Sequence, residues 1–289
     1  MISIIIINYN TFDLTVACIK SVIAFTTSDF EIILVDNAST VCDPEEFKKE
    51  FPFIKLVKSP KNYGFARGNN MGIREATGDH ILLLNSDTLL LNDAIDLAFK
   101  KIKSDQTIGA LSVQLIGTDG ALQQCSHYWS NLGKLTGCLF RLHHIFSYFR
   151  NTQPDMRIEN YSQYLWGTFF LFPKEVLKIF KTQRLPETFF MYGEDTEWSH
   201  HIRKAGFKLL YYPEGKILHY GAASNKTTPS EKWANGFQNE YQLHLIIKGK
   251  VYTYFYYLVL ALFYFSAFSR EPATRGAYIL NYLFKKSFT

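Results

Sequence analysis

The sequence is poor in cysteine, with four among 289 residues, and it has no CxxC pair. The four lie far apart, at Cys18, Cys42, Cys125 and Cys138. This spacing argues against a zinc cluster and a disulfide scaffold, and it suits a reducing compartment. A basic signal-peptide region is also missing ahead of the apolar run that starts at Ile2. We therefore expect the protein to stay on the cytoplasmic side of the membrane.

The sequence also lacks a strong charge of either sign. Its formal net charge is +5 and its pI is about 8.8. These values suit an anionic ligand or an anionic membrane surface, but they are too small to predict nucleic-acid binding. The length is sufficient for one large α/β domain, or for one domain with an appendage.

Four short aliphatic runs predict the strands of a sheet, at residues 2–7, 31–35, 54–57 and 80–84. A helical pattern of apolar residues separates the first two runs, and a strand, helix, strand order predicts parallel pairing with a right-handed crossover. We therefore expect an α/β fold with a Rossmann-like, mostly parallel central sheet flanked by helices. No GxGxxG follows the first run, which excludes the dinucleotide-binding fingerprint.

Polar residues follow three of these runs. They are Asn8, Tyr9 and Asn10 after the first, Asp36 after the second, and Asn85, Ser86 and Asp87 after the fourth. Ligands bind at the carboxyl ends of strands in open α/β sheets, so the pattern favours a nucleotide site. Asp87 taken alone is equally well explained as a turn cap, a helix N-cap or a metal ligand.

A glycine-rich turn, NYGFARGNNMG at residues 62–72, contains Asn62, Gly64 and Arg67. Its glycines allow close backbone approach at the start of a predicted helix, where amide donors and the helix dipole favour an anion.

Further along the chain, the pattern predicts a helix at residues 92–103, a hairpin of residues 108–116 with 121–124, and a strand at 166–172. Residues 126–163 are aromatic, basic and poorly periodic, and we expect an insertion near the site. A helix is predicted from Pro173 to Phe180, and separate strands at 208–212 and 216–219.

Residues 189–198, FFMYGEDTEW, come just before a helical pattern that closes at Gly206. Glu194 and Asp195 therefore lie at a helix start, where an acidic residue is most simply an N-cap. His219 ends the strand predicted at 216–219, and a structural role and a ligand role are both open for it.

Taken together, these segments resemble the inverting nucleotide-sugar glycosyltransferases of glycosyltransferase family 2, especially the rhamnosyltransferase-like members that build bacterial surface polysaccharides. The resemblance covers residues 1–225. It rests on seven segments in the family's order: SIIIINYN, ILVDNAST, NYGFARGNNMGI, LLLNSDT, WGTFFLF, FFMYGEDTEWSHHIRKAGF and YYPEGKILHYGAAS. It implies a GT-A fold, a divalent ion (Mg²⁺ or Mn²⁺), and single-displacement transfer from a nucleotide-diphosphate sugar to a lipid-linked or oligosaccharide acceptor. Residues 1–115 would form the nucleotide-sugar-binding half, and residues 116–225 the acceptor-binding half.

The resemblance also implies roles for individual residues. Asp195 would be the catalytic base, with Glu194 as its neighbour, and Asp87 and His219 would bind the metal. The implied donor-binding residues are Asn8, Tyr9, Asn10, Asp36, Asn62, Gly64, Arg67, Asn85 and Ser86. The implied acceptor-binding residues are Trp166, Gly167 and Trp198, although core packing explains either tryptophan equally well.

One position departs from the family's pattern. The first aspartate of its DxD motif is Asn85 here, which makes the expected metal site less anionic. This departure keeps open a different class of function, a non-catalytic nucleotide-sugar binder or partner subunit. Other donors, such as UDP-galactose, UDP-GlcNAc or a furanose, are open within the enzyme class.

Residues 226–289 form an aromatic-rich extension that we expect to be helical. Residues 251–269 are uncharged, and five tyrosines interrupt the apolar run. We expect a helix lying on the inner face of the cell membrane, with YILNYLFKK near the C-terminus as a second contact. Packing on the catalytic domain, or on a second subunit of a homo-oligomer, is the alternative.

Overall fold

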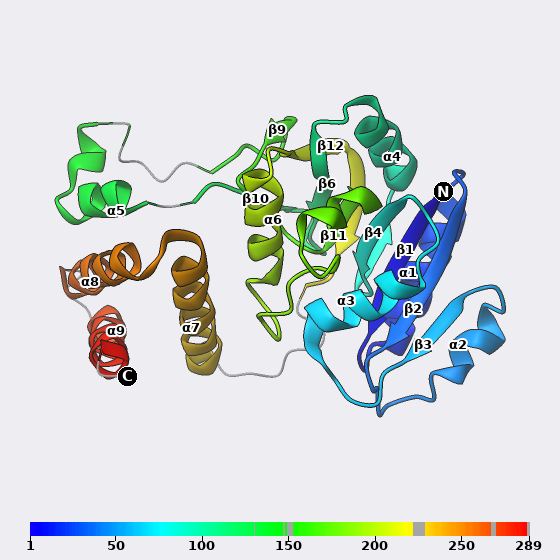
Figure 1. Ribbon diagram of the computed structural model, residues 1–289, viewed down its shortest axis with the longest axis horizontal. Coiled ribbons are helices and arrows are strands. Elements are labelled where there is room, and N and C mark those ends of the chain that lie inside the picture. Colours follow the sequence, from blue (N-terminus) through cyan, green and yellow to red (C-terminus); the bar gives the residue numbers. More distant parts are fainter. Residues whose placement is uncertain (130, 147, 149–152, 222–228, 267–269, 288–289) are drawn as a thin grey trace. The chain divides into compact units, whose positions relative to one another are not determined.

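The computed structural model describes residues 1–129, 131–146, 148, 153–221, 229–266 and 270–287 (Figure 1). Residue contacts divide the chain into two compact units. One comprises Met1–His127 and Pro154–Glu231, and the other comprises Tyr128–Gln153 and Lys232–Thr289. Most of the segment expected as an insertion near the site is thus grouped with the C-terminal helices.

The first unit is built on a mixed sheet that has ten strands within the described residues. The strand order is β3-β2-β1-β4-β11-β6-β12-β5, with β7 paired to β6 and β9 paired to β12. The strands are β1 Ile2–Asn8, β2 Phe30–Asp36, β3 Lys55–Lys58, β4 His80–Asn85, β5 Thr88–Leu90, β6 Ile108–Ile116, β7 Leu122–Gln123, β9 Asn160–Tyr161, β11 Phe169–Pro173 and β12 Lys208–His219. Two further strands, β8 Ser126–His127 and β10 Tyr164–Leu165, form a separate antiparallel pair.

The helices of this unit are α1 Phe12–Phe25, α2 Glu45–Glu50, α3 Gly64–Glu75, α4 Ala94–Ser104 and α6 Glu194–Lys204, with a 3-10 helix, η3 Lys174–Ile179. Helix α3 packs on β1 and β2, whereas α4 and α6 pack on β6 and β12. The helix predicted from Pro173 is therefore a 3-10 helix, and Pro173 itself is extended and ends β11.

The sequence of β1 does not alternate between apolar and polar residues, and the position of the strand in the sheet explains why. It pairs in parallel with β2 on one side and β4 on the other. Ile4, Ile5 and Ile6 are all fully buried, so both faces of the strand are covered. Burying each such side chain stabilises the fold by about 1.5–3 kcal/mol. Strand β11 then pairs antiparallel to β4, which makes the sheet mixed at its centre.

The two strands predicted at 208–212 and 216–219 are one strand, β12. Its register against β6 shifts between Tyr212 and Lys216, so the chain bulges there and then continues its pairing. Gly215 lies in this bulge, where an added Cβ would meet Val113 at 2.7 Å. Gly215 is thus a point of close packing between the bulge and β6.

The second unit is helical. It contains α5 Leu132–Leu139, the 3-10 helix η1 Leu142–His144, α7 Pro229–Lys248, α8 Lys250–Ser266 and α9 Arg270–Ser287. Helix α8 packs on α5 and α9 around an aromatic core that includes Tyr257 and Phe237. The predicted helix at 251–269 is α8, although residues 267–269 lie outside the described residues. Among the helices described, none combines the length and the apolar character that crossing a bilayer requires.

Candidate active site

The polar strand ends predicted from the sequence meet at one edge of the sheet. In the parallel register, Asn8 pairs with Asp36, and Ile7 pairs with Asn85. The carboxyl ends of β1, β2 and β4 therefore lie side by side, and the residues that follow them form the rim of this edge.

Asn8 orders this edge through its side chain. Its amide nitrogen donates to Asp36 Oδ1 at 2.8 Å and to Ser39 Oγ at 2.9 Å. Its amide oxygen accepts from the hydroxyls of Thr11 and Thr15, both at 3.1 Å. A carboxamide has two N–H donors, so both are already used. Asn8 is buried, and its side chain positions Asp36.

Asp36 and Asn10 hold the loop after β2. Asp36 Oδ2 accepts from the amide of Ser39 at 3.1 Å, and Asn10 Oδ1 accepts from the amide of Thr40 at 2.7 Å. Asn10 and Ala38 both adopt a left-handed backbone, with φ of 57° and 63°. Non-glycine residues in this region store strain that is common at ligand sites. Tyr9, between these segments, is partly exposed.

The start of α3 uses its amides within the protein. The N–H groups of Tyr63 and Gly64 donate to Asn37 Oδ1 at 3.1 Å and to Asn62 Oδ1 at 2.9 Å. The N–H of Phe65 donates to the carbonyl of Phe190 at 2.9 Å. These three backbone donors are therefore already paired within the protein. Arg67 is exposed, and its guanidinium lies 3.7 Å from the centre of the Tyr63 ring. It is the cationic side chain within the glycine-rich turn at residues 62–72.

Asp87 and His219, predicted from two distant strand ends, lie together. His219 Nε2 is 3.6 Å from Asp87 Oδ1, and both side chains are nearly buried. His219 Nδ1 lies 2.7 Å from Gln123 Oε1, which as a carbonyl oxygen accepts the Nδ1 proton. Burial lowers the pKa of His219 and so favours the neutral imidazole, although Asp87 opposes this effect. The lone pair of Nε2 then faces the carboxylate across the space that a cation would fill.

These residues fit a divalent ion only in part. An oxygen ligand from Asp87 and a nitrogen ligand from His219 suit Mn²⁺ or Mg²⁺. Asn85 Oδ1 is buried without a hydrogen-bond partner, so this oxygen is available as a further ligand for a metal ion. Ser86 is tied instead to Thr11, with 3.1 Å between their hydroxyl oxygens. No cluster of three or more His, Cys, Asp or Glu residues suited to a metal occurs in the described part of the chain, so the bound substrate would have to supply further ligands.

Asp195 is the second residue of α6, and its carboxylate accepts several hydrogen bonds. Its Oδ2 accepts from the amide of Gly167 at 3.0 Å, and its Oδ1 accepts from the amide of Thr196 at 2.7 Å. Tyr192 and Gly193, with φ of 68° and 111°, turn the chain sharply just before it. Burial raises the pKa of Asp195, while the donated hydrogen bonds lower it. The side chain remains partly exposed, as a base that meets substrate must be.

Glu194 is more deeply buried, with 4% of its surface exposed. Its Oε2 has no hydrogen-bond partner. Burial, and then the charge of Asp195, raise the pKa of Glu194. The neutral acid is therefore favoured, and it could donate a hydrogen bond to a substrate oxygen.

The two residues that precede β11, Gly167 and Thr168, link this acid pair to the end of β4. The amide of Asn85 donates to the carbonyl of Thr168 at 3.0 Å, and the preceding residue, Gly167, donates to Asp195. An added Cβ on Gly167 would meet the Phe65 ring at 2.8 Å, so the glycine permits this close packing. The predicted base and the predicted metal segment are thus joined through Gly167 and Thr168.

The two tryptophans differ in position. Trp198 is fully buried, and its ring nitrogen donates to the carbonyl of Pro186 at 2.9 Å. It therefore cannot stack on a sugar, which corrects the acceptor-binding expectation in favour of core packing. Trp166 is partly exposed, and its ring centre lies 5.4 Å from that of His127, which stacks on Tyr164.

Sequence reasoning missed several groups that build this site, namely Thr11, Asn37, Ser39 and Gln123. All are small hydroxyl or amide residues, which have many roles in turns and strands. Only Asn37 and Ser39 carried a signal, because they lie directly after a predicted strand.

A model of the family described as Glycosyl transferase family 2 matches residues 3–180, which is more than half of the chain. An uncharacterized glycosyltransferase of Rickettsia conorii is 35% identical over 109 residues, which are 37% of this chain and 18% of that protein. The glycosyltransferase GlyG of Streptococcus pneumoniae is 29% identical over 117 residues, 38% of each chain. A hyaluronan synthase of Pasteurella multocida is 26% identical over 219 residues, 72% of this chain and 22% of that protein. The matched part spans well under half the length of these relatives.

Two solved structures share the fold. GalNAc-T7 with UDP, GalNAc and Mn²⁺ gives a TM-score of 0.65 at 18% identity, covering 89% of this chain and 50% of that one. Staphylococcus aureus TarS 1-349 in complex with UDP gives a TM-score of 0.58 at 14% identity. The match covers 91% of this chain and 70% of the TarS chain. At such identities the likeness shows the fold alone, and it confirms the predicted GT-A fold.

The family model covers the segments from SIIIINYN to WGTFFLF, on which much of the resemblance rests. Those segments form β1, the end of β2, the start of α3, β4 and β11, the parts of the first unit that build the site. Sequence match, fold and site geometry agree, and the chain belongs to glycosyltransferase family 2.

Proposed function

We propose that the protein is an inverting glycosyltransferase that moves a sugar from a nucleotide-diphosphate donor to a hydroxyl of a lipid-linked glycan. The observation that carries this proposal is the pair of hydrogen bonds made by Gly167 and Thr168, just before β11, which join Asp195 to the strand end that leads to Asp87. A base and a diphosphate-binding group must both lie near the reacting carbon, and this arrangement supplies both.

In the proposed reaction, the acceptor hydroxyl attacks C1 of the donor sugar. The new bond joins C1 to the acceptor oxygen, while the bond from C1 to the diphosphate oxygen breaks. Asp195 takes the proton of the hydroxyl, and the bonding electrons leave with the nucleoside diphosphate. Because attack comes from the face opposite the leaving group, the anomeric configuration inverts. Glu194, as a neutral acid, holds an acceptor oxygen by donating a hydrogen bond, and the exposed face of Trp166 offers apolar contact to the acceptor.

Asp87 and His219 would hold a divalent ion, Mg²⁺ or Mn²⁺, which neutralises charge that develops on the departing diphosphate. The donor nucleotide would lie along the loops after β1 and β2, next to Asp36, Asn62 and Arg67. The GalNAc-T7 structure is a complex with UDP, GalNAc and Mn²⁺, and the TarS structure is a complex with UDP, which supports a nucleotide and a metal of this kind. The resemblance in sequence supports dTDP-rhamnose or a UDP-sugar as donor, and a role in surface polysaccharide synthesis on the inner face of the membrane.

The test combines binding with turnover. A thermal-shift panel of dTDP, UDP, GDP and CMP, with Mn²⁺ and with EDTA, should give one nucleotide that stabilises the wild-type protein only with metal. Asp87→Ala should abolish that shift. Asp195→Asn should keep it but lower the rate of donor-dependent nucleoside diphosphate release by about 10²–10⁴-fold.

A non-catalytic nucleotide-sugar binder or partner subunit is the second candidate, and Asn85 in place of an acid favours it. That candidate predicts a metal-dependent shift without turnover. Turnover that Asp195→Asn leaves unchanged would refute Asp195 as the base. A panel in which no nucleotide stabilises the protein would contradict the donor site itself.

A further inference from the structure

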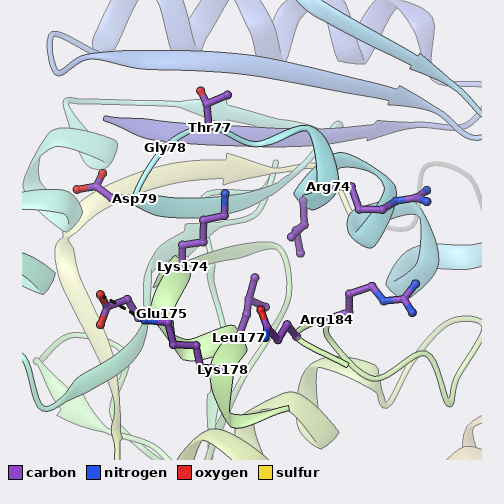
Figure 2. A pocket seen from close by; sticks show the side chains of 11 residues that line it. Arg74, Thr77, Gly78, Asp79, Lys174, Glu175, Leu177, Lys178 and Arg184 are labelled. Carbon is purple, nitrogen blue, oxygen red and sulfur yellow. Dashed lines mark ion pairs between the residues drawn. The ribbon is translucent and has the colours of Figure 1, made fainter. Parts of the chain in front are cut away.

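A groove of about 540 Å³ lies at the edge of the sheet where β4 begins and β11 ends. This edge is opposite to the one that holds Asn85 and the other strand ends, and the proposed reaction does not use it. The groove is lined by the last turn of α3, the turn into β4, η3 and the segment Gln183–Arg184 (Figure 2). Ile73 and Leu177, each 5% exposed, give it an apolar floor.

The charges around the groove do not balance. It is lined by four cationic residues, Arg74, Lys174, Lys178 and Arg184, and by two acidic ones, Asp79 and Glu175. Both acidic side chains already form ion pairs. Asp79 pairs with the amino group of Met1 at 2.9 Å, and Glu175 pairs with Lys178 at 3.9 Å. The Lys174 side chain donates to the carbonyl of Ala76 at 2.7 Å, and it pairs with no acid within the described residues.

Arg74 and Arg184 make no ion pair within the described residues. Figure 2 shows their guanidinium groups pointing in the same direction from two different segments. Both side chains are exposed. A guanidinium presents a planar fork of donors that matches two oxygens of a phosphate.

A buried residue brings these two arginines to the same groove. Asn70, 2% exposed, donates to the carbonyl of Leu185 at 2.8 Å and accepts from the amide of Leu185 at 3.1 Å. Asn70 is one helical turn before Arg74 on α3, and Leu185 directly follows Arg184. The clamp therefore fixes the backbones that carry the two guanidinium groups.

The backbone at the groove is also strained. Gln183 adopts a left-handed conformation, with φ of 50°, although it is neither glycine nor asparagine. Such a conformation is strained and persists where the surroundings enforce it, often at ligand sites. Here it turns the chain so that Arg184 comes back to the groove.

We propose that this groove binds an organic phosphate or diphosphate. Arg74 and Arg184 hold the phosphate oxygens, Lys174 adds charge, and the carbon part of the ligand lies on Ile73 and Leu177. The proposal does not depend on the proposed glycosyl transfer, since the groove and the strand ends of the active site lie at opposite edges of the sheet.

The test titrates inorganic pyrophosphate into the full chain by calorimetry, in EDTA and with an excess of UDP. We expect binding that persists under both conditions. Arg74→Gln with Arg184→Gln should weaken it by at least about tenfold. Arg74→Lys with Arg184→Lys should weaken it less, because the charge stays while the paired donors are lost.

Lys181→Gln is the matched control, because Lys181 is exposed near the groove without lining it. The proposal is overturned if the double glutamine variant binds pyrophosphate like the wild type, if Lys181→Gln weakens binding equally, or if the nucleotide displaces all of it. All three variants change exposed side chains, and an unchanged melting temperature would verify that they fold.

The phosphate could come from a soluble metabolite or from a lipid headgroup. Sedimentation with phosphatidylcholine vesicles, with and without phosphatidic acid, separates the two sources. Binding to phosphatidic acid that pyrophosphate displaces, and that the double glutamine variant loses, assigns a lipid headgroup. Pyrophosphate binding without this vesicle effect assigns a soluble ligand.

Discussion

At the scale of single residues, Asp195 has a pKa set by two opposed effects. Burial raises the pKa, and hydrogen bonds from Gly167 and Thr196 lower it because they stabilise the charged form. The proposed base acts only when it is deprotonated, so the rate should fall as the pH drops through this pKa. Among these donors, the hydroxyl of Thr196, 3.2 Å from Asp195 Oδ1, can be removed with little change of shape.

Thr196→Val should therefore raise the pKa of Asp195 and move the acidic limb of the kcat/KM profile to higher pH. Thr188→Val is the control, since the Thr188 hydroxyl donates to Glu197 at 3.0 Å and not to Asp195. The measurement is the pH dependence of nucleoside diphosphate release for the three proteins. An acidic limb at the same pH in Thr196→Val and wild type would contradict the assignment of Asp195.

At the scale of elements, α3 and the segment before α6 depend on Gly64. Its φ is 81°, and an added Cβ would overlap the carbonyl oxygen of Phe190, which accepts from the amide of Phe65. Gly120 has a similar φ of 77°, but an added Cβ there meets nothing within 4 Å. The two glycines therefore separate the cost of backbone strain from the cost of a steric clash.

Gly120→Ala should lower the free energy of unfolding by about 1–2 kcal/mol, the cost of a left-handed alanine. Gly64→Ala should lower the free energy of unfolding by about 1–3 kcal/mol more than Gly120→Ala does, because the packing around Phe190 has to shift. Urea unfolding of both variants gives the comparison. Equal losses would mean that the contact between α3 and Phe190 does not constrain the chain.

The elements that the sequence predicted best are those in which local pattern and tertiary setting agree. The aliphatic runs at 2–7 and 80–84 became β1 and β4 within one residue of their expected ends, because a strand covered on both faces needs a continuous apolar run. The position of β11 between β4 and β6 could not be predicted, since pairing over about 85 residues leaves no local signal. The same holds for the grouping of Tyr128–Gln153 with the C-terminal helices.

The site was predictable at its strand ends and less so elsewhere. Asp87 and His219 lie 3.6 Å apart as the resemblance implied, because parallel strand ends gather at one edge. The start of α3 looked like an anion site from its glycines, yet Asn37, Asn62 and Phe190 take up its amides. Sequence shows which groups can donate, but two of the acceptors that reach them, Asn37 and Phe190, come from segments far along the chain.

At the scale of the whole molecule, helix α8 carries an exposed apolar stripe. Val251, Phe255 and Leu262 are 73%, 52% and 48% exposed, and their spacing places them on one face of the helix. Lys248 and Lys250 lie at its start. An apolar face beside basic residues favours the surface of an anionic membrane, as we propose for this extension.

Val251→Asn with Phe255→Asn should lower binding to anionic vesicles about tenfold or more, since burying each such apolar side chain is worth about 1.5–3 kcal/mol. Phe53→Asn is the control, because Phe53 is 61% exposed in the other unit. Co-sedimentation measures the bound fraction. Equal binding of the double variant and wild type would exclude this face as the membrane contact.

Strand β3 gives the molecule a protected border. It ends the strand order, has four residues, and carries a lysine at each end. Lys55 pairs with Glu75 at 2.7 Å and Lys58 pairs with Glu45 at 2.6 Å, so charged groups flank the free backbone N–H and C=O groups. A neighbouring chain that added a strand here would have to displace these ion pairs and desolvate the lysines. The sheet therefore resists growth from one molecule into the next, and crowding of many copies at this border should not seed fibres.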